Sequence, residues 1–91
     1  MSIQWLFDVI QSRKAEPLEG SYTSSLFKEG LTKIAQKVGE EGTEVVVAAL
    51  AQDDQRLIEE VADLAYHTLV LLSARGLSPA DIEKELEKRH R

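Results

Sequence analysis

Along this chain the apolar residues recur at intervals of three and four, the spacing of an α-helix, and no segment alternates in the manner of a β-strand. The first apolar stripe predicts a helix over about residues 3–14, and the loop of residues 16–20 then breaks the pattern. Several polar residues at 21–25 are suitable N-caps for a short second helix that ends at Gly30.

Two long helices occupy the middle of the chain. The pattern predicts the first over about residues 31–52, and the second from a capping aspartate at 53 or 54 to residue 75, before Gly76. A last helix over about residues 79–88 begins with a strong start signal, because Ser78 is followed by a proline at the first helical position and an aspartate at the third.

The second half of the first long helix is apolar on every side, from Val45 to Ala51. A helix with apolar residues all round must be buried all round. Five helices in 91 residues cannot easily enclose it, so we expect a second copy of the chain to cover it. The predicted fold is therefore all-α: a single domain over residues 1–91, with four to five helices in an antiparallel helical bundle completed by homodimerisation.

The acidic residues gather on the two long helices. Between Glu40 and Asp63 the chain has eight acidic residues and one basic residue, a net charge of −7, whereas the whole chain carries −5. A helix advances about 100° per residue, so acids spaced by one, three and four residues share a face. Like charges this close repel unless a cation lies among them. Five acids meet this description: Glu40, Glu41 and Glu44 on the first long helix, and Glu60 and Asp63 on the second.

The two acidic groups are expected to lie at the same height if the long helices fold back as a hairpin. The turn falls near Asp53, nine residues after Glu44 and seven before Glu60. At 1.5 Å per residue the two arms differ by only about 3 Å. An acid-rich face in contact with solvent is the alternative, but matched heights favour a site for a divalent cation. Mg²⁺ fits best, because it prefers carboxylate oxygens and retains positions for water and phosphates.

Composition excludes several other classes of protein. The chain has no cysteine, so it has neither disulfides nor a zinc–thiolate site. A net charge of −5 argues against a nucleic-acid binder. The sequence begins without the basic and apolar regions of a signal peptide, and no apolar run approaches the ~18 residues of a membrane span. A cytoplasmic protein with no membrane partner is the resulting expectation.

The spacing of the acids resembles a known metal-binding signature. Glu-Glu-x-x-Glu followed by Glu-x-x-Asp is similar to that of the all-α, MazG-like nucleoside triphosphate pyrophosphohydrolases. Within that superfamily three segments resemble the phosphoribosyl-ATP pyrophosphohydrolase family, and the similarity covers essentially the whole chain. The segments are Ser21-Tyr22-Thr23, Lys33–Glu41 and Glu59–His67.

The resemblance implies hydrolysis of phosphoribosyl-ATP to phosphoribosyl-AMP and pyrophosphate with Mg²⁺, the second step of histidine biosynthesis. Such chemistry depends on metal ions, a positioned water and cationic groups around the phosphates. Our hypothesis for the metal ligands comprises four acids: Glu41, Glu44, Glu60 and Asp63. Glu40 is either a further ligand or the base that orients the attacking water, so the catalytic candidates are Glu40 and Glu41.

The cationic and hydroxyl residues near the acids have two readings each. Lys33 and Lys37 lie on the glutamate face, and each either pairs with an acid or binds a substrate phosphate. The same choice between an exposed ion pair and a substrate contact applies to Arg56. The segment Ser21-Tyr22-Thr23 either caps a helix or binds phosphate at the helix N-terminus.

Two further residues follow the second acidic group. Tyr66 and His67 come about one helical turn after Asp63. We expect Tyr66 to be a packing residue. A hydrogen bond to a neighbouring acid is the expected role of His67, in preference to metal binding.

Two other functions keep part of this picture. A house-cleaning nucleoside triphosphate pyrophosphohydrolase would keep the metal site and change the substrate. A non-catalytic helical interaction module would use the acids to bind a basic partner, and it has no need for two clusters at equal height. The expected function is therefore that of a hydrolase acting on a phosphoanhydride bond, with a small nucleotide substrate and no nucleic-acid partner.

Overall fold

The computed structural model describes residues 1–90, which form five α-helices and no strand. This result confirms the all-α class. The helix ends lie close to those predicted from the apolar pattern and the capping residues. In chain order the helices are α1 (Ile3–Ala15), α2 (Tyr22–Glu29), α3 (Leu31–Ala51), α4 (Asp54–Ala74) and α5 (Pro79–Arg89).

The helix boundaries follow from local hydrogen bonds. The carboxylate of Asp53 accepts a hydrogen bond of 2.9 Å from the backbone N–H of Arg56 and so caps α4. At the start of α5 the carboxylate of Asp81 accepts from the backbone N–H of Ser78, also at 2.9 Å. Gly30 separates α2 from α3 with a φ of +99°, a conformation that strains any residue with a Cβ.

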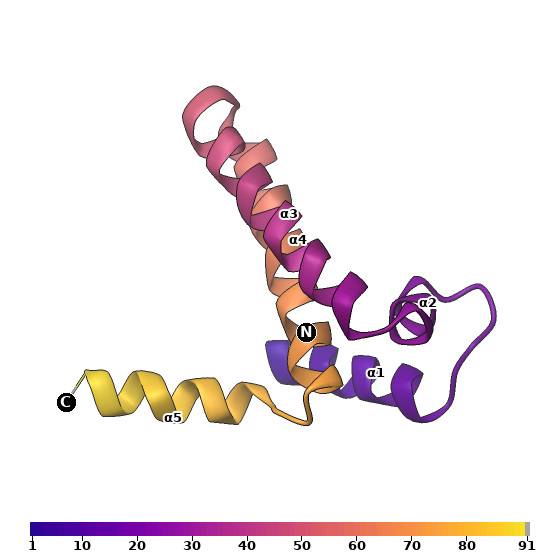
Figure 1. Ribbon diagram of the computed structural model, residues 1–91. Helices are drawn as coiled ribbons and strands as arrows, with labels where there is room; N and C mark the ends of the chain where they lie inside the picture. Colours follow the sequence, from indigo (N-terminus) through magenta and orange to yellow (C-terminus); the bar gives the residue numbers. More distant parts are fainter. Residues whose placement is uncertain (91) are drawn as a thin grey trace.

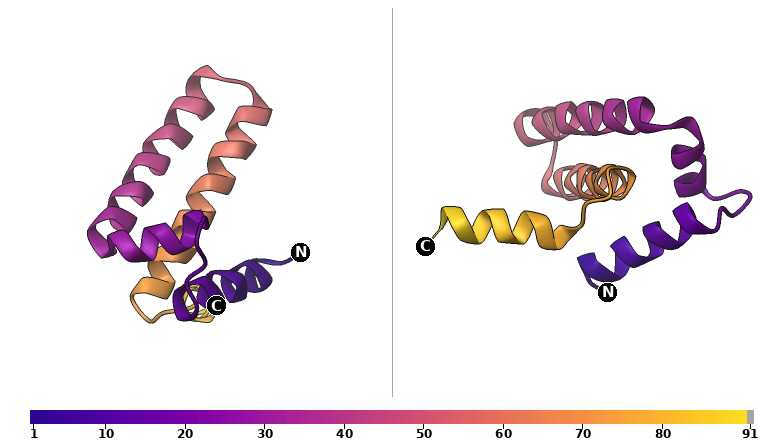
Figure 2. Two further views of the ribbon diagram at one scale, coloured as in Figure 1. Left: turned by 90° about the vertical axis from the view of Figure 1, so that its right-hand side faces the viewer. Right: turned by 60° about the horizontal axis from the view of Figure 1, so that its bottom comes forward.

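The centre of the molecule is a helical hairpin formed by α3 and α4, which lie side by side and are joined by the short turn at Gln52 and Asp53 (Figure 1). Helices α1 and α2 pack around the end formed by the start of α3 and the C-terminal half of α4, which we call the lower end. The upper end contains the turn between α3 and α4. Helix α5 projects away from the hairpin. Figure 2 shows the same arrangement from two other directions. The hairpin that the matched acidic groups required is therefore present.

The buried apolar core lies at the lower end of the hairpin. It joins one face of α1 and residues from α2 and α3 to the C-terminal half of α4. A face of this kind is what the three- and four-residue spacing of the apolar positions produces. The core residues are Phe7, Ile10, Leu26, Ile34, Leu69, Val70 and Leu72.

The upper end of the hairpin, by contrast, leaves large apolar side chains exposed. Leu50 near the end of α3 is 83% exposed, and only Ala48 is buried in this part of the helix. Helix α5 contains no buried residue. The half-helix that is apolar on every side thus has one covered side within a single chain. Other exposed apolar residues in these regions are Val46, Val47, Ile58, Val61, Ile82 and Leu86.

Candidate metal centre

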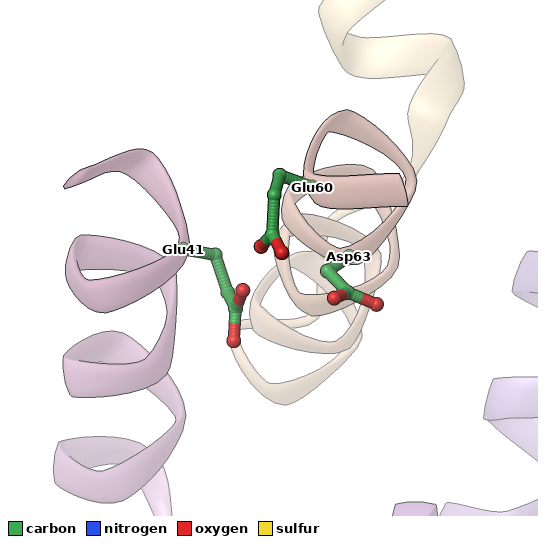
Figure 3. A group of neighbouring side chains, drawn as sticks. All are labelled: Glu41, Glu60 and Asp63. Atoms are coloured by element: carbon green, nitrogen blue, oxygen red, sulfur yellow. The ribbon is translucent and has the colours of Figure 1, made fainter. Parts of the chain in front are cut away.

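Three carboxylates from α3 and α4 converge at mid-height of the hairpin. Glu41, Glu60 and Asp63 each contribute an oxygen atom to a group in which all of these atoms lie within 4.8 Å of one another. Figure 3 shows Glu41 on α3 pointing toward the two acids on α4. The sequence placed the two acidic groups at equal height on the hairpin, and in the structure three of the five predicted acids lie together.

Two of these carboxylates are buried and incompletely paired. Glu41 and Glu60 are only 5% exposed as residues, and within residues 1–90 the Oε2 atom of each lacks any hydrogen-bond partner. Buried charged oxygens are normally paired, hydrogen-bonded or bound to metal, because their desolvation is expensive. The hard oxygen donors of this group fit a divalent cation such as Mg²⁺.

Glu41 is buried because of its position on α3. Residues Ile34, Glu41 and Ala48 are spaced by seven and form the buried side of the helix. Seven residues are nearly two full turns, so a seven-residue spacing places side chains in one line. The sequence therefore places a carboxylate in the middle of an apolar stripe that faces α4.

Glu44 lies on the solvent side of the same group. Contacts with the carboxylates of Glu60 and then Glu41 raise the pKa of the exposed Glu44 side chain to about 7. Crowded acids behave in this way because one proton shared among them relieves the repulsion. Glu44 is therefore electrostatically linked to Glu41 and Glu60, although the converging group of three does not include it.

Glu40, in contrast, turns toward its own helix. Its Oε1 atom accepts a hydrogen bond of 3.1 Å from Gln36, and its Oε2 atom lies 3.4 Å from Nζ of Lys37. These contacts with Gln36 and Lys37 lower the pKa of Glu40. The structure thus gives the adjacent acids different environments, with Glu41 inside the group of three and Glu40 beside it.

Lys37 connects these two environments. Its Nζ atom is also 3.4 Å from Oε1 of Glu41. Burial, the largest single effect, disfavours the ammonium group, but contacts with Glu41, Tyr22 and Glu40 together outweigh it and raise the pKa of Lys37. A firmly charged ammonium group therefore lies at the edge of the acidic cluster.

The other predicted cations differ in their surroundings. The guanidinium of Arg56 contacts the carboxylates of Glu59 and Glu60, so it is attached to the acidic cluster from the opposite helix. Lys33 is half-buried one turn before Lys37. Its charge acts on Glu40, where it is one of the smaller effects that lower the pKa of that acid.

The segment Ser21-Tyr22-Thr23 forms the start of α2 and has two kinds of contact. The hydroxyl of Ser21 caps the helix by accepting from the backbone N–H of Ser24 at 3.2 Å. Tyr22 and Thr23 instead reach α4, where the hydroxyl of Tyr22 lies 3.1 Å from Nε2 of His67, and that of Thr23 bonds to Tyr66. The cap was one of the two readings considered for this segment.

The expectations for Tyr66 and His67 were incomplete. Tyr66 does pack against the core, but its hydroxyl also bonds to Thr23. The ring of His67 is buried and bonds to the backbone carbonyl of Asp63 at 2.8 Å rather than to a carboxylate. The partners on α2 are distant in sequence, because Thr23 lies 43 residues from Tyr66 and Tyr22 lies 45 residues from His67, so helical periodicity gives no signal for them.

A cleft of about 850 Å³ opens on another side of α2. Its walls come from the loop after α1, from α2 and from the first turn of α3, and they include apolar residues such as Leu18, Leu31 and Ile34. Ser21 belongs to this lining, whereas none of the five acids does. The cleft and the acidic cluster are therefore separate features that approach each other near the N-terminus of α2.

The fold and the site together define a class of protein: an all-α chain in which a helical hairpin holds a partly buried carboxylate cluster suited to a divalent cation. The family described as phosphoribosyl-ATP pyrophosphohydrolase matches residues 4–90. The chain belongs to this family.

Individual relatives agree with the family assignment. A phosphoribosyl-ATP pyrophosphatase from Clostridium botulinum strain Hall is 53% identical over 87 residues, which cover 96% of this chain and 79% of the relative. One from Listeria monocytogenes is 56% identical over 84 residues, covering 92% of this chain and 81% of the relative. A histidine biosynthesis bifunctional protein from Oceanobacillus iheyensis is 53% identical over 81 residues, which make up 89% of this chain and 38% of the relative.

None of the helices described within residues 1–90 has the length and apolar character that a membrane span needs.

Proposed function

We propose that this chain hydrolyses phosphoribosyl-ATP to phosphoribosyl-AMP and pyrophosphate in histidine biosynthesis, with Mg²⁺ as its cofactor. Relatives that bear the name of this activity are more than half identical to almost the whole chain, which supports the substrate. The observation that carries the proposal is the convergence of Glu41, Glu60 and Asp63. An unpaired buried oxygen on two of these acids gives that group a reason to bind a cation.

In the proposed site Glu41, Glu60 and Asp63 bind the metal, and Glu44 completes the set from the solvent side. When bound, the ion supplies positive charge to the phosphate oxygens as the phosphoanhydride bond breaks. Glu40 lies outside the group of three, and its carboxylate is fixed by Gln36 and Lys37. That position suits a residue that orients the attacking water, the second of the two roles considered for it.

The cationic residues would hold the triphosphate chain. Lys37 lies beside Glu41, so its ammonium group can contact a phosphate that also reaches the metal. Arg56 occupies the corresponding place on α4 next to Glu60. Lys33 extends the positive charge by one turn of α3, and Ser21-Tyr22-Thr23 contributes hydroxyls and the free N–H groups of a helix start.

The assembled protein is proposed to be a homodimer in which the upper ends of two hairpins form an antiparallel helical bundle. Val46, Val47 and Leu50 of α3 and Ile58 and Val61 of α4 are exposed toward this end, and Leu50 is almost fully exposed in one chain. Contiguous exposed apolar surface of this kind marks an interface. The segment Val45–Ala51 is apolar on every side, and a second copy of the chain would bury the sides that remain exposed.

The decisive measurement is pyrophosphate release by the purified protein with phosphoribosyl-ATP as substrate. Release that depends on Mg²⁺ and stops on addition of a chelator is the expected result. ATP, dCTP and dUTP serve as parallel substrates, because a house-cleaning enzyme would prefer one of them. Asp8→Asn is a matched control for Asp63→Asn, since Asp8 is an exposed aspartate on α1 outside the cluster.

Two results would contradict the proposal. Equal turnover of phosphoribosyl-ATP with and without divalent cation would remove the metal from the reaction. Turnover by Asp63→Asn at the rate of Asp8→Asn would remove the acidic cluster from it. A complete lack of hydrolysis with every nucleotide would instead favour a non-catalytic helical module.

A further inference from the structure

Two consecutive residues of α2 bond to two consecutive residues of α4. Tyr22 pairs with His67, and Thr23 pairs with Tyr66. The three aromatic rings also pack together, with the His67 ring edge-on to Tyr66 at a centroid distance of 5.0 Å and edge-on to Tyr22 at 5.9 Å. We call these four residues the clasp. Because α2 packs chiefly against α1 and α3, the clasp is what ties its first turn to α4.

The hydrogen bonds of the clasp have a defined direction. A carbonyl oxygen can only accept, so Nδ1 of His67 donates its proton to the backbone oxygen of Asp63. In the neutral form of the ring, Nε2 is then an acceptor, and the hydroxyl of Tyr22 donates to it. The proton of Tyr22 is thereby directed into α4, and the lone pairs of its oxygen point elsewhere.

Burial alone does not account for the position of Tyr22. Its side chain remains 52% exposed, so packing leaves half of the ring in contact with solvent. His67, by contrast, is 5% exposed and immobilised in the core. Because the buried His67 ring holds the hydroxyl of Tyr22, it determines the orientation of the half-exposed Tyr22 ring.

The clasp also lies next to the acidic cluster. Asp63, which accepts the hydrogen bond from His67, is one of the three converging acids. On the other side of the ring, Nε2 of His67 is 3.1 Å from the hydroxyl of Tyr22. Tyr22 is thus joined to Asp63 through the two hydrogen bonds of the His67 ring.

We infer that Tyr66 and His67 are positioning residues for substrate binding, whose hydrogen bonds to Thr23 and Tyr22 hold the first turn of α2 beside the acidic cluster. This inference rests on the proposed function, because it concerns the same substrate. The exposed half of the Tyr22 ring contacts the nucleotide, while the Tyr22 hydroxyl is held by His67, so His67 acts only through Tyr22. Neither Tyr66 nor His67 binds the metal or takes part in bond cleavage.

A double-mutant cycle on KM tests the inference. Tyr22→Phe removes the hydroxyl, and His67→Phe keeps a ring of similar size but removes the acceptor. Each change is expected to raise KM for phosphoribosyl-ATP by about tenfold, the loss expected for one hydrogen bond, with kcat nearly unchanged. The double variant is expected to match the single variants, because His67 has no route to the substrate except Tyr22.

Rescue and a matched control complete the experiment. His67→Gln places an amide oxygen near the position of Nε2, so its KM is expected to return close to that of the unaltered protein. His90 makes the same local bond as His67, from Nδ1 to the backbone oxygen four residues earlier, but lies exposed at the end of α5. His90→Phe is therefore expected to leave KM unchanged. Tyr66→Phe repeats the test on the other half of the clasp.

Several outcomes would overturn the inference. An unchanged KM in His67→Phe would show that the clasp does not affect substrate binding. A loss of Mg²⁺ affinity, measured by calorimetry, would show that His67 acts through Asp63 instead. Multiplying effects in the double variant, or a failure of His67→Gln to recover, would indicate a role in packing alone. If the unaltered protein does not hydrolyse phosphoribosyl-ATP at all, the proposed function is wrong as well, whereas normal hydrolysis with these results refutes only the clasp.

Discussion

The acids of the cluster lower the free energy of unfolding of the protein. Glu41 and Glu60 are buried with one unpaired oxygen each, and Asp63 adds a third negative charge within 4.8 Å. Buried like charges without full pairing destabilise a protein. Sites with this property are retained for function, so neutralising them is expected to trade activity for stability.

The substitution Asp63→Asn tests whether neutralising an acid of the cluster raises stability and removes activity. Within residues 1–90, Asp63 forms no ion pair, so the change removes repulsion without breaking an attractive contact. We expect Tm in the presence of a chelator to rise by a few degrees, while turnover and the Mg²⁺-induced rise in Tm disappear. Differential scanning fluorimetry with and without Mg²⁺ measures both. A lower Tm in the chelator would contradict the idea that repulsion dominates at this position.

The raised pKa of Glu44 predicts how stability depends on pH in the metal-free protein. Its pKa is about 7 in the folded state, against an ordinary value of 4.5. Between these values the folded state holds a proton that the unfolded state has lost, so unfolding becomes easier as pH rises. The contribution of Glu44 is complete below pH 4.5 and is lost as pH approaches about 7.

Urea unfolding in a chelator across this pH range provides the measurement. Glu44→Gln cannot lose this proton, so the variant is expected to lack that part of the decline. The difference between the two proteins should grow up to about pH 7 and then level off. Parallel curves for the two proteins would mean that Glu44 does not share a proton with Glu41 and Glu60.

The sequence predicted which acids are near one another but not how each is oriented. Glu40 and Glu41 differ by about 100° around α3, and both lie within the arc assigned to the cluster. Which of them turns inward depends on the face that α4 covers. The buried series Ile34, Glu41 and Ala48 settles this in the structure. The sequence named Glu41 as a metal ligand but left open whether Glu40 is a further ligand or the base that orients the water.

For whole elements the sequence was more informative, because helix ends are set by local chemistry. Asp53, Ser78 and Gly30 act on backbone groups within a few residues of themselves, so their effects can be read directly. The pairing of α3 with α4 was equally accessible, since the turn between them is short. The attachment of α2 to α4 was not, because it depends on hydrogen bonds between distant residues.

Gly42 offers a test of how α3 is surrounded. A Cβ added to Gly42 or to Gly39 would meet nothing within 4 Å in the chain itself. Replacing a mid-helix glycine with alanine then stabilises the helix by about 1 kcal/mol. We expect this gain in the free energy of unfolding for both Gly42→Ala and Gly39→Ala, measured by urea denaturation. A loss for Gly42→Ala alone would place another helix against the backbone of α3 at that residue.

On the scale of the whole molecule, the core lies at one end of the hairpin, and exposed apolar residues of α3 and α4 lie at the other end. The lower end is covered by α1 and α2, while the upper end exposes Leu50, Val46 and Ile58. This division could be anticipated in part, since the all-round apolar stretch of α3 required more cover than one small chain provides. The projecting position of α5 could not, because its own pattern is only weakly apolar (Figure 1).

Leu50→Glu is expected to shift the proposed dimer to monomer. The side chain is 83% exposed in one chain, so the charge should not disturb the monomer fold, whereas burying it in an interface would be costly. Sedimentation at micromolar concentration compares this variant with Leu18→Glu, which introduces the same charge in the loop before α2 at a 54% exposed leucine. Dimers in both variants would place the dimer interface away from Leu50. Monomers in the unaltered protein would mean that there is no dimer.

The location of the acids gives the proposed magnesium ion a second role, in the stability of the protein. They lie between α3 and α4, the two helices against which α1 and α2 pack, so their mutual repulsion acts where the central helices meet. Magnesium starvation would then shorten the lifetime of the protein, because the opened chain is the form that proteases degrade. We therefore expect the amount of the polypeptide in the cell to fall soon after its catalysis stops. Faster digestion by dilute protease after chelation, reversed when magnesium is restored, would reveal this link between ion supply and protein abundance.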